Sequence, residues 1–305
     1  MTERLLVITP ARNEAHQIKV TIESVLEQEH RPWRYYLVSD GSDDGTDEIM
    51  ASYATKHDFI RYLRREKPAD ELERVEKVTP GKVGAIQQAL ESVFEGDIAY
   101  LGILDADVVL PVNYYKRLLE EFSRNENLGL AGGYLRSVLP NGNIAPGGFM
   151  NPEAPGGPAQ TFRWKCYQDI GGYKPYGHED CIALSEARNR GWQVRSFADI
   201  MVDHHVPYEG YAPTIHHKVP ALYKLGKMDY VMFVPAWFVL LQSTARCFSK
   251  PYLFAGIARL TGYLSAIISH PTRMPPQKSW WGRQRSYGRT VASKLRRVSQ
   301  RLAGN

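Results

Sequence analysis

The stretch IAYLGILDAD, residues 98–107, joins a run of apolar residues to two carboxylates. An apolar run of this length that ends in polar residues is typical of a buried β-strand. Similar runs occur earlier in the chain, at Leu5–Thr9, Tyr35–Ser39 and Phe59–Leu63. Amphipathic stretches that we expect to be helices lie between and after them, at Ala15–Glu27, Thr46–Lys56 and Lys82–Phe94. Alternating strands and helices predict right-handed crossovers and an α/β fold, with a mostly parallel, Rossmann-like sheet flanked by helices.

Polar loops follow three of the expected strands. They are Pro10–Glu14, Asp40–Thr46 and Asp105–Asp107. Ligands of such sheets bind beyond the carboxyl ends of the strands, so we expect the three loops to meet at one edge. Asp40 is placed to accept a hydrogen bond from a base or ribose, whereas Asp44 and Thr46 are expected to cap the next helix.

Asp105 and Asp107 are separated by one residue, so both carboxylates can reach one divalent cation. Mg²⁺ and Mn²⁺ prefer oxygen ligands, and they fill the rest of their coordination with water and phosphate oxygens. A D-x-D sequence alone is weak, and its simpler interpretation is a pair of solvated turn aspartates.

Taken together, these pieces resemble the family-2 glycosyltransferases with a GT-A fold. The matching motifs are Thr9–Glu14, Asp40–Thr46, Gly81–Ala85, Leu104–Asp107, Phe162-Arg163 before Ile170–Tyr173, and His178–Asp180. They follow in the same order over roughly the first two-thirds of the chain. The remaining third resembles the C-terminal part of some envelope-polysaccharide members, through His204-His205, Tyr223–Gly226 and Lys250–Tyr252.

The resemblance implies a nucleoside-diphosphate sugar as donor, with uridine the commonest base in the family. The residues that it places at the donor are Pro10, Glu14, Asp40, Arg65 (or its neighbour Arg64), Lys82, Asp105 and Arg163. It implies a Mg²⁺ or Mn²⁺ ion held by Asp105, Asp107 and one of the histidines, of which we prefer His205 to His204.

The resemblance also implies that Asp180 is the general base of an inverting transfer. Such a reaction needs one carboxylate opposite the leaving nucleotide and no second carboxylate as nucleophile. Glu179 and Asp180 stand at the start of an expected helix, Cys181–Arg190. Their simpler interpretation is that they place negative charge at the helix N-terminus.

We expect three parts in the chain: a GT-A catalytic domain over residues 1–215, a helical, membrane-facing segment over 216–275 and a basic tail over 276–305. Residues 140–158 are rich in Gly, Pro and Asn, which predicts a long mobile loop. The apolar stretches Val231–Leu241 and Tyr252–Ile268 are shorter or more broken than a spanning helix. We favour a pair of helices in the plane of a membrane surface over two ordinary buried helices.

The composition of the chain disfavours several classes of protein. A chain with 43% hydrophobic and 23% charged residues is not disordered as a whole. The three cysteines have no paired spacing, which disfavours a disulfide scaffold and a zinc site and suits a reducing cytosol. The N-terminus lacks the pattern of a signal peptide. The basic tail suits an anionic membrane or nucleic acid, or is a solvated terminus, and no motif supports nucleic-acid binding.

The expected partners are therefore a glycan or lipid-linked acceptor and a membrane surface, at the cytoplasmic face of the cell membrane. Two alternatives are weaker. A nucleotidyltransferase typically has an N-terminal Gly-rich loop, where this chain has Pro10–Glu14. An inactive membrane-associated scaffold of the same fold would be indicated by a lost carboxylate, and all the candidates are present.

Overall fold

The computed structural model of the chain describes residues 4–65, 81–93, 98–175, 178–206, 215–231, 234–247 and 252–269. The chain divides into two compact units, Met1–Tyr211 and Ala212–Asn305. The expected basic tail, residues 276–305, and Lys250 lie outside the described residues.

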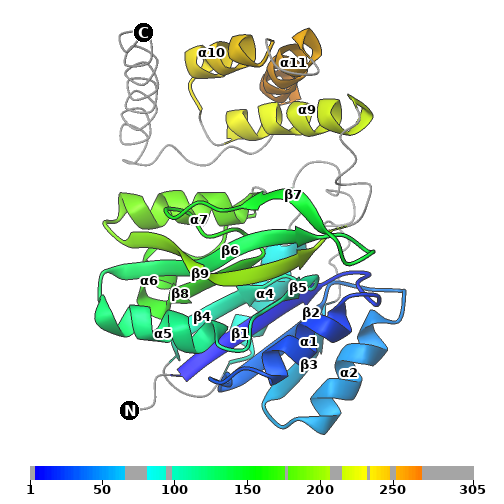
Figure 1. Cartoon of the computed structure of the whole chain (residues 1–305), viewed down its shortest axis with the longest axis vertical. Helices are drawn as coiled ribbons and strands as arrows, with labels where there is room; N and C mark the ends of the chain where they lie inside the picture. Colours follow the sequence, from blue (N-terminus) through cyan, green and yellow to red (C-terminus); the bar gives the residue numbers. More distant parts are fainter. Residues whose placement is uncertain are drawn as a thin grey trace. The chain divides into compact units, whose positions relative to one another are not determined.

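The first unit is built on one sheet with the strand order β3-β2-β1-β4-β8-β6-β9-β5, and β7 pairs with β6 (Figure 1). The strands are β1 Arg4–Ala11, β2 Arg34–Ser39, β3 Ile60–Arg64, β4 Ile98–Leu104, β5 Val108–Val109, β6 Leu128–Val138, β7 Ile144–Phe149, β8 Ala159–Arg163 and β9 Gln193–His205. The pairs β1–β2, β2–β3, β1–β4 and β6–β9 are parallel, whereas β5, β7 and β8 run antiparallel to their neighbours. The prediction of an α/β fold with a mostly parallel sheet is confirmed.

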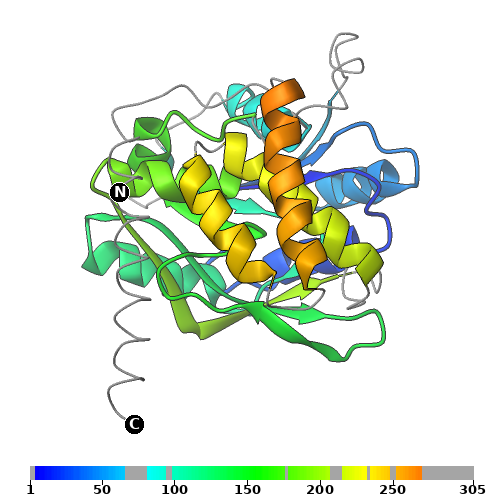
Figure 2. The same cartoon turned by 90° about the horizontal axis from the view of Figure 1, so that it is seen from above.

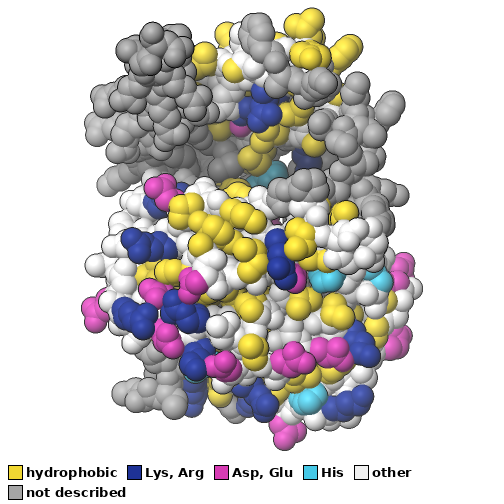
Figure 3. Space-filling model, viewed as in Figure 1, with side chains coloured by type: hydrophobic (Ala, Val, Ile, Leu, Met, Phe, Trp, Pro, Cys, Tyr) yellow, Lys and Arg dark blue, Asp and Glu magenta, His cyan; other side chains and the backbone are white. Residues whose placement is uncertain are grey.

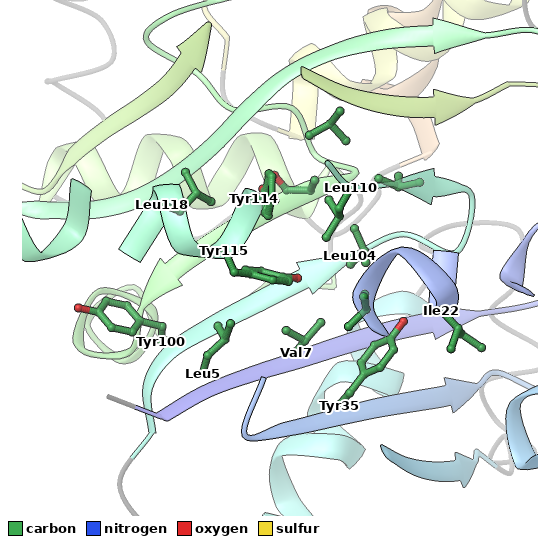
Figure 4. Packing of buried hydrophobic residues seen from close by; sticks show 14 of the residues in the cluster. Leu5, Val7, Ile22, Tyr35, Tyr100, Leu104, Leu110, Tyr114, Tyr115 and Leu118 are labelled. Carbon is green, nitrogen blue, oxygen red and sulfur yellow. The ribbon is translucent and has the colours of Figure 1, made fainter. Parts of the chain in front are cut away.

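Helices cover both faces of the sheet. They are α1 Ile18–Leu26, α2 Thr46–Lys56, α4 Gly81–Glu91, α5 Tyr114–Arg124, α6 Trp164–Asp169 and α7 Glu179–Asn189. Side chains alternate along each strand, so Leu5 and Val7 pack with α1, α2 and α5, while Leu6 and Ile8 pack with α4, α6 and α7. Figure 4 shows the first of these layers, where Val7, Ile22 and Tyr35 gather. Burial on both faces explains why the strands appear as continuous apolar runs.

The segment of residues 140–158 differs from the expected long loop. Within it, β7 pairs antiparallel with β6, matching Phe149 to Leu135 and Ile144 to Val138. Among the described strands, β7 is bonded to β6 alone. The prediction of a structureless loop is therefore wrong for Ile144–Phe149.

The second unit contains α9 Ile215–Val231, α10 Ala236–Arg246 and α11 Leu253–Ser269. Figure 2 shows α10 and α11 side by side, with α11 crossing α9. The apolar stretches of the sequence correspond to α10 and α11, whereas α9 was not expected from the apolar pattern. Among the described helices, none is both long enough and apolar enough to cross a membrane.

The close pairing of β6 and β9 predicts that Gly133→Ala destabilises the first unit. A Cβ at Gly133 would lie 2.5 Å from the carbonyl oxygen of Ile200, and backbone atoms in a sheet cannot move aside easily. We expect a loss of about 2 kcal/mol or more in the free energy of unfolding, measured by urea denaturation. The control is Gly191→Ala, which meets open space but has a φ of +88° and should cost about 1 kcal/mol. A smaller loss at Gly133 than at Gly191 would contradict this packing.

Candidate functional site

A cleft of about 210 Å³ opens at the carboxyl edge of the central strands in the first unit. It is lined by Pro10, Ala11, Arg12, Glu14, Asp40, Lys82, Asp105, Ala106 and Asp107. The strands β2, β1 and β4 are neighbours in the sheet, so their carboxyl ends deliver the three polar loops to one place. The structure therefore brings together most of the residues that the sequence placed at the donor.

The backbone of the Asp105–Asp107 loop is held from three sides. The amide of Asp105 donates to the carbonyl oxygen of Pro158 at 2.8 Å. The hydroxyl of Thr21, on α1, donates to the carbonyl oxygen of Ala106 at 2.8 Å. The amide of His205, on β9, donates to the carbonyl oxygen of Asp107 at 2.8 Å. The two carboxylates are thus positioned by the fold and need no ligand to hold them together.

The loops that follow β1 and β2 are tied to each other. The amide of Glu14 donates to the Thr46 hydroxyl at 2.8 Å, and the amide of Ala15 donates to Asp44 at 3.0 Å. Asp44 also accepts from the amide of Thr46, the first residue of α2, at 3.0 Å. Asp44 and Thr46 were expected mainly to cap α2. Asp44 does accept from the first amide of α2, but Thr46 is the first residue of that helix, whose N-cap is Gly45, and its hydroxyl fixes the position of Glu14.

Lys82 joins two acidic groups from different elements. Its ammonium nitrogen lies 2.5 Å from Oδ1 of Asp105 and 3.8 Å from Oε1 of Glu179, the first residue of α7. Burial opposes the charged form of Lys82, but the carboxylates of Asp105 and Glu179 outweigh it and raise the pKa of Lys82. Burial raises the pKa of Asp105, and Lys82 opposes that rise. Lys82 thus links the cleft to the start of α7.

The pKa of Glu14 reflects its burial and the negative charges around it. Its pKa is raised from 4.5 to about 7, first by burial and then by the charges of Asp107, Asp105 and Asp44. The charges of these three carboxylates therefore add to the effect of burial. A site of this kind gains free energy from binding a cation.

The chemistry of the cleft residues suits a divalent cation. Asp105 and Asp107 supply the oxygen ligands that Mg²⁺ and Mn²⁺ prefer, and the pKa of Glu14 indicates excess negative charge. Within the part of the chain that the structure describes, no group of three or more His, Cys, Asp or Glu side chains is arranged to hold a metal. The residues fit a cation that takes its remaining ligands from water and phosphate oxygens.

The histidine beside this site is His204. Its Nε2 lies 3.2 Å from Oδ2 of Asp107. Burial lowers the pKa of His204, but the hydrogen bond and the charge of Asp107 outweigh it, and the net direction is upward. Successive side chains of a strand point to opposite faces, so the side chain of His205 points away from that of His204. The preference for His205 as the ligand is corrected: it contributes its backbone amide, and His204 brings its ring to Asp107.

Asp40 pairs with Arg65 at the end of β2. Nη1 of Arg65 lies 2.7 Å from Oδ1 of Asp40, and both side chains are almost fully buried. Arg64 instead pairs with Asp47, on α2. Of the two candidate arginines, the structure therefore brings Arg65 to the cleft wall, behind Asp40.

Two glycines of α4 make room for this ion pair. An added Cβ at Gly81 would collide with the Asp40 carboxylate, and one at Gly84 would lie 2.5 Å from Cζ of Arg65. Residues three apart share one face of a helix, so the spacing of Gly81 and Gly84 forms a seat for the pair. The G-x-x-G spacing in the sequence was the signal for this role, and Gly81–Ala85 was interpreted only as one of the motifs of the family resemblance.

Asp180 is the second residue of α7. Its carboxylate packs against Gly157, where an added Cβ would collide with it, and it is hydrogen-bonded to the thiol of Cys181. Its charge contributes to the raised pKa of Lys82. Asp180 thus stands near the cleft, on the side of Glu179, without lining it.

Arg163 lies elsewhere in the fold. In the antiparallel pairing of β8 with β4, Ala159 is opposite Leu104, next to Asp105, whereas Arg163 is opposite Tyr100. Its guanidinium donates to three backbone carbonyls, those of Phe122, Asn125 and Leu128. The prediction that Arg163 contacts the donor is corrected: it holds the end of α5 against the far end of β4.

Comparison with known proteins agrees with this architecture. The profile of "Glycosyl transferase family 2" matches residues 6–178. The poly-β-1,6-N-acetyl-D-glucosamine synthase of Staphylococcus epidermidis is 28% identical over 121 residues, which are 40% of this chain and 26% of that protein. The chain spans less than half of the length of the curated relatives that it matches.

Solved structures show the same fold. A mannosyltransferase from Pyrobaculum calidifontis, in complex with GDP-Man and Mn²⁺, is 16% identical, with a TM-score of 0.57 over 95% of this chain and 80% of that chain. GalNAc-T7, with UDP, GalNAc and Mn²⁺, is 14% identical, with a TM-score of 0.58 over 88% of this chain and 58% of that chain.

The raised pKa of Glu14 predicts a pH-dependent effect of Glu14→Gln on stability. The unfolded chain ionises Glu14 near pH 4.5 and the folded chain near pH 7, so the folded state of the parent loses stability between these values. The Glu14→Gln variant should therefore equal the parent below about pH 4.5. Above pH 7 it should be more stable by about 1 kcal/mol, after allowance for solvent screening. Thermal melts in chelator-treated buffers from pH 4.5 to 8 measure this difference, and parallel curves for the two proteins would contradict it.

Proposed function

This chain belongs to glycosyl transferase family 2, and we propose that it transfers a sugar from a nucleoside-diphosphate sugar to an acceptor hydroxyl with inversion. The observation that carries the proposal is the cleft itself, where three strand ends bring Glu14, Asp40 and the Asp105–Asp107 pair together. Asp180 stands beside it at the start of α7.

The donor is proposed to lie along the carboxyl edge of the sheet. Asp40, fixed by Arg65, would bind the base or ribose, and Pro10 and Glu14 would line the nucleotide. Lys82 would place its ammonium at the diphosphate, because it is the lysine that lines the cleft. UDP is the preferred nucleotide.

Asp105 and Asp107 are proposed to hold Mg²⁺ or Mn²⁺, with His204 beside them. A divalent cation bound there neutralises charge on the departing diphosphate. The solved relatives that were crystallised with GDP-Man or UDP also contain Mn²⁺, which supports the same class of donor and cation here.

Asp180 is proposed to accept the proton of the acceptor hydroxyl as that oxygen attacks the sugar. Its carboxylate is confined by Gly157 and by the Cys181 thiol, which restricts its orientation. The ammonium of Lys82 lies between Asp105 and Glu179, so positive charge separates the base from the aspartate pair.

The acceptor is proposed to be a glycan or a lipid-linked sugar of the cell envelope, reached at the cytoplasmic face of the membrane. The named relative, a polysaccharide synthase, supports a polysaccharide product. An inactive scaffold of the same fold is the alternative, and the complete set of carboxylates around the cleft disfavours it.

Nucleotide binding tests the donor site without knowledge of the acceptor. We expect one of UDP, GDP and TDP, added with Mn²⁺, to raise the melting temperature of the chain by mass action. Asp107→Ala should remove the part of the shift that depends on Mn²⁺, because it deletes one of the two carboxylates. Asp199→Ala, at an exposed aspartate of β9, is the control and should keep the full shift. Absence of a shift with every nucleotide would favour the scaffold alternative.

Substitution of the proposed base tests the chemistry. Asp180→Asn should lower the release of nucleoside diphosphate from its sugar by about 10²–10⁴-fold, because general-base catalysis contributes that much. Nucleotide affinity, measured by calorimetry, should stay within about twofold of the parent. Full turnover by Asp180→Asn, with donor binding unchanged, would refute the assignment of the base.

A further inference from the structure

The helices of the second unit are closely packed on their inner sides. α9 and α11 cross at Gly226 and Gly262, where an added Cβ would collide with the backbone of Arg259 or Tyr223. α10 approaches α11 at Gly256 in the same way. Such close contact requires that these faces are already occupied by one another.

An ion pair and a hydrogen bond join the helices on these inner sides. Nε of Arg259 lies 2.6 Å from Oδ2 of Asp229, and both side chains are only 5% exposed. The hydroxyl of Tyr263 donates to the carbonyl oxygen of Val234 at 3.1 Å. Among the described residues, the inner sides of α9, α10 and α11 are therefore covered by the helices themselves.

The sides of α10 and α11 that do not face the neighbouring helices carry large apolar side chains that are exposed. They are Trp237, Leu240 and Leu241 on α10 and Phe254, Ile257 and Leu264 on α11, and together they define the α10–α11 face. Phe254, for example, is 65% exposed. Their spacing by three, four and seven residues puts them on one stripe of each helix. Figure 2 shows α10 and α11 side by side, and Figure 3 shows hydrophobic side chains gathered over this unit.

From residue 230 to residue 305, every charged side chain is Lys or Arg. Residues 230–305 contain twelve Lys and Arg and no Asp or Glu. Within α10 and α11 themselves, the charged residues are Arg246 and Arg259, and Arg259 is buried and paired with Asp229. The positive charge that can face a lipid surface therefore comes from Arg246 and from the Lys and Arg residues outside these two helices. An apolar helical face accompanied by cations alone matches the chemistry of an anionic lipid surface.

The lengths of α10 and α11 determine how these helices can lie in a lipid bilayer. α11 has 17 residues, about 25 Å of helix, and α10 has 11 residues. A bilayer core of about 30 Å requires roughly 20 apolar residues, so neither helix crosses it upright. We propose that the α10–α11 face lies in the plane of an anionic phospholipid surface and buries its apolar side chains among the lipids. The partner inferred for the proposed transferase is thus an anionic phospholipid surface. The inference rests on the proposed function in one respect: a lipid-linked acceptor would require the enzyme to work at such a surface.

Vesicle flotation of the full chain tests the proposal. We expect the chain to float with vesicles of phosphatidylcholine and phosphatidylglycerol, and more weakly with phosphatidylcholine alone. Phe254→Ser with Ile257→Ser should weaken binding to the mixed vesicles at least about tenfold, because it removes two buried apolar side chains. Trp237→Ser with Leu240→Ser, on α10, provides a second variant in case the first fails to fold.

A matched control comes from the first unit. Ile144 and Phe149 of β7 are also exposed and apolar, so Ile144→Ser with Phe149→Ser should leave vesicle binding unchanged. Brominated lipids should quench tryptophan fluorescence of the parent, and Trp237→Phe should reduce that quenching.

Three outcomes would overturn the proposal. Absence of flotation with mixed vesicles is the first. The second is a dimer in light scattering that Phe254→Ser with Ile257→Ser dissociates while vesicle binding is unaltered, which would assign the face to a second copy. The third is vesicle binding that needs only residues 270–305. The nucleotide-dependent melting shift, measured on the same samples, separates a failure of the lipid surface from a failure of the proposed function.

Discussion

Repulsion among carboxylates at one edge of the sheet is the constraint on which the rest of the catalytic unit depends. Glu14, Asp105 and Asp107 line one cleft, and the pKa of Glu14 rises to about 7, first because Glu14 is buried and then because of the neighbouring carboxylates. Such a cluster would separate if its loops were free to move. It persists because the backbone between the two aspartates is bonded to α1, to β9 and to the segment before β8. The core on both faces of the sheet keeps those elements in place.

Charge balance then explains how distant elements are joined. Lys82, in the first turn of α4, faces both Asp105 after β4 and Glu179 at the start of α7. One ammonium is thus shared by the carboxylates of the cleft and by the helix that carries Asp180. Because a single charge serves both, a change in the charge bound beside Asp105 alters the field at the start of α7. The cleft and the start of α7 are therefore electrostatically coupled through one residue.

Local patterns in the sequence were sufficient to predict the four strands β1 to β4 and the meeting of their loops. Apolar runs identify strands buried on both faces, and parallel strands place their carboxyl ends at one edge. Features that depend on pairing between distant segments were not accessible in this way. The direction of β8 decides that Arg163 lies at the far end of β4, and the pairing of Val108 with His204 decides which histidine faces Asp107. β7 contains Gly and Pro, so its strand forms only because β6 provides a partner.

Glycines contribute to the site as much as charged residues do. Gly81 and Gly84 lie against Asp40 and Arg65, and Gly157 lies against Asp180. In each case a methyl group would occupy the space that the charged group now fills, so the polar group can approach the backbone closely. Close approach excludes water and limits the orientations of each carboxylate, and both effects strengthen its interactions with a ligand. The motif G-K-V-G therefore has two roles. Its lysine supplies a positive charge, and its glycines leave space for the ion pair between Asp40 and Arg65.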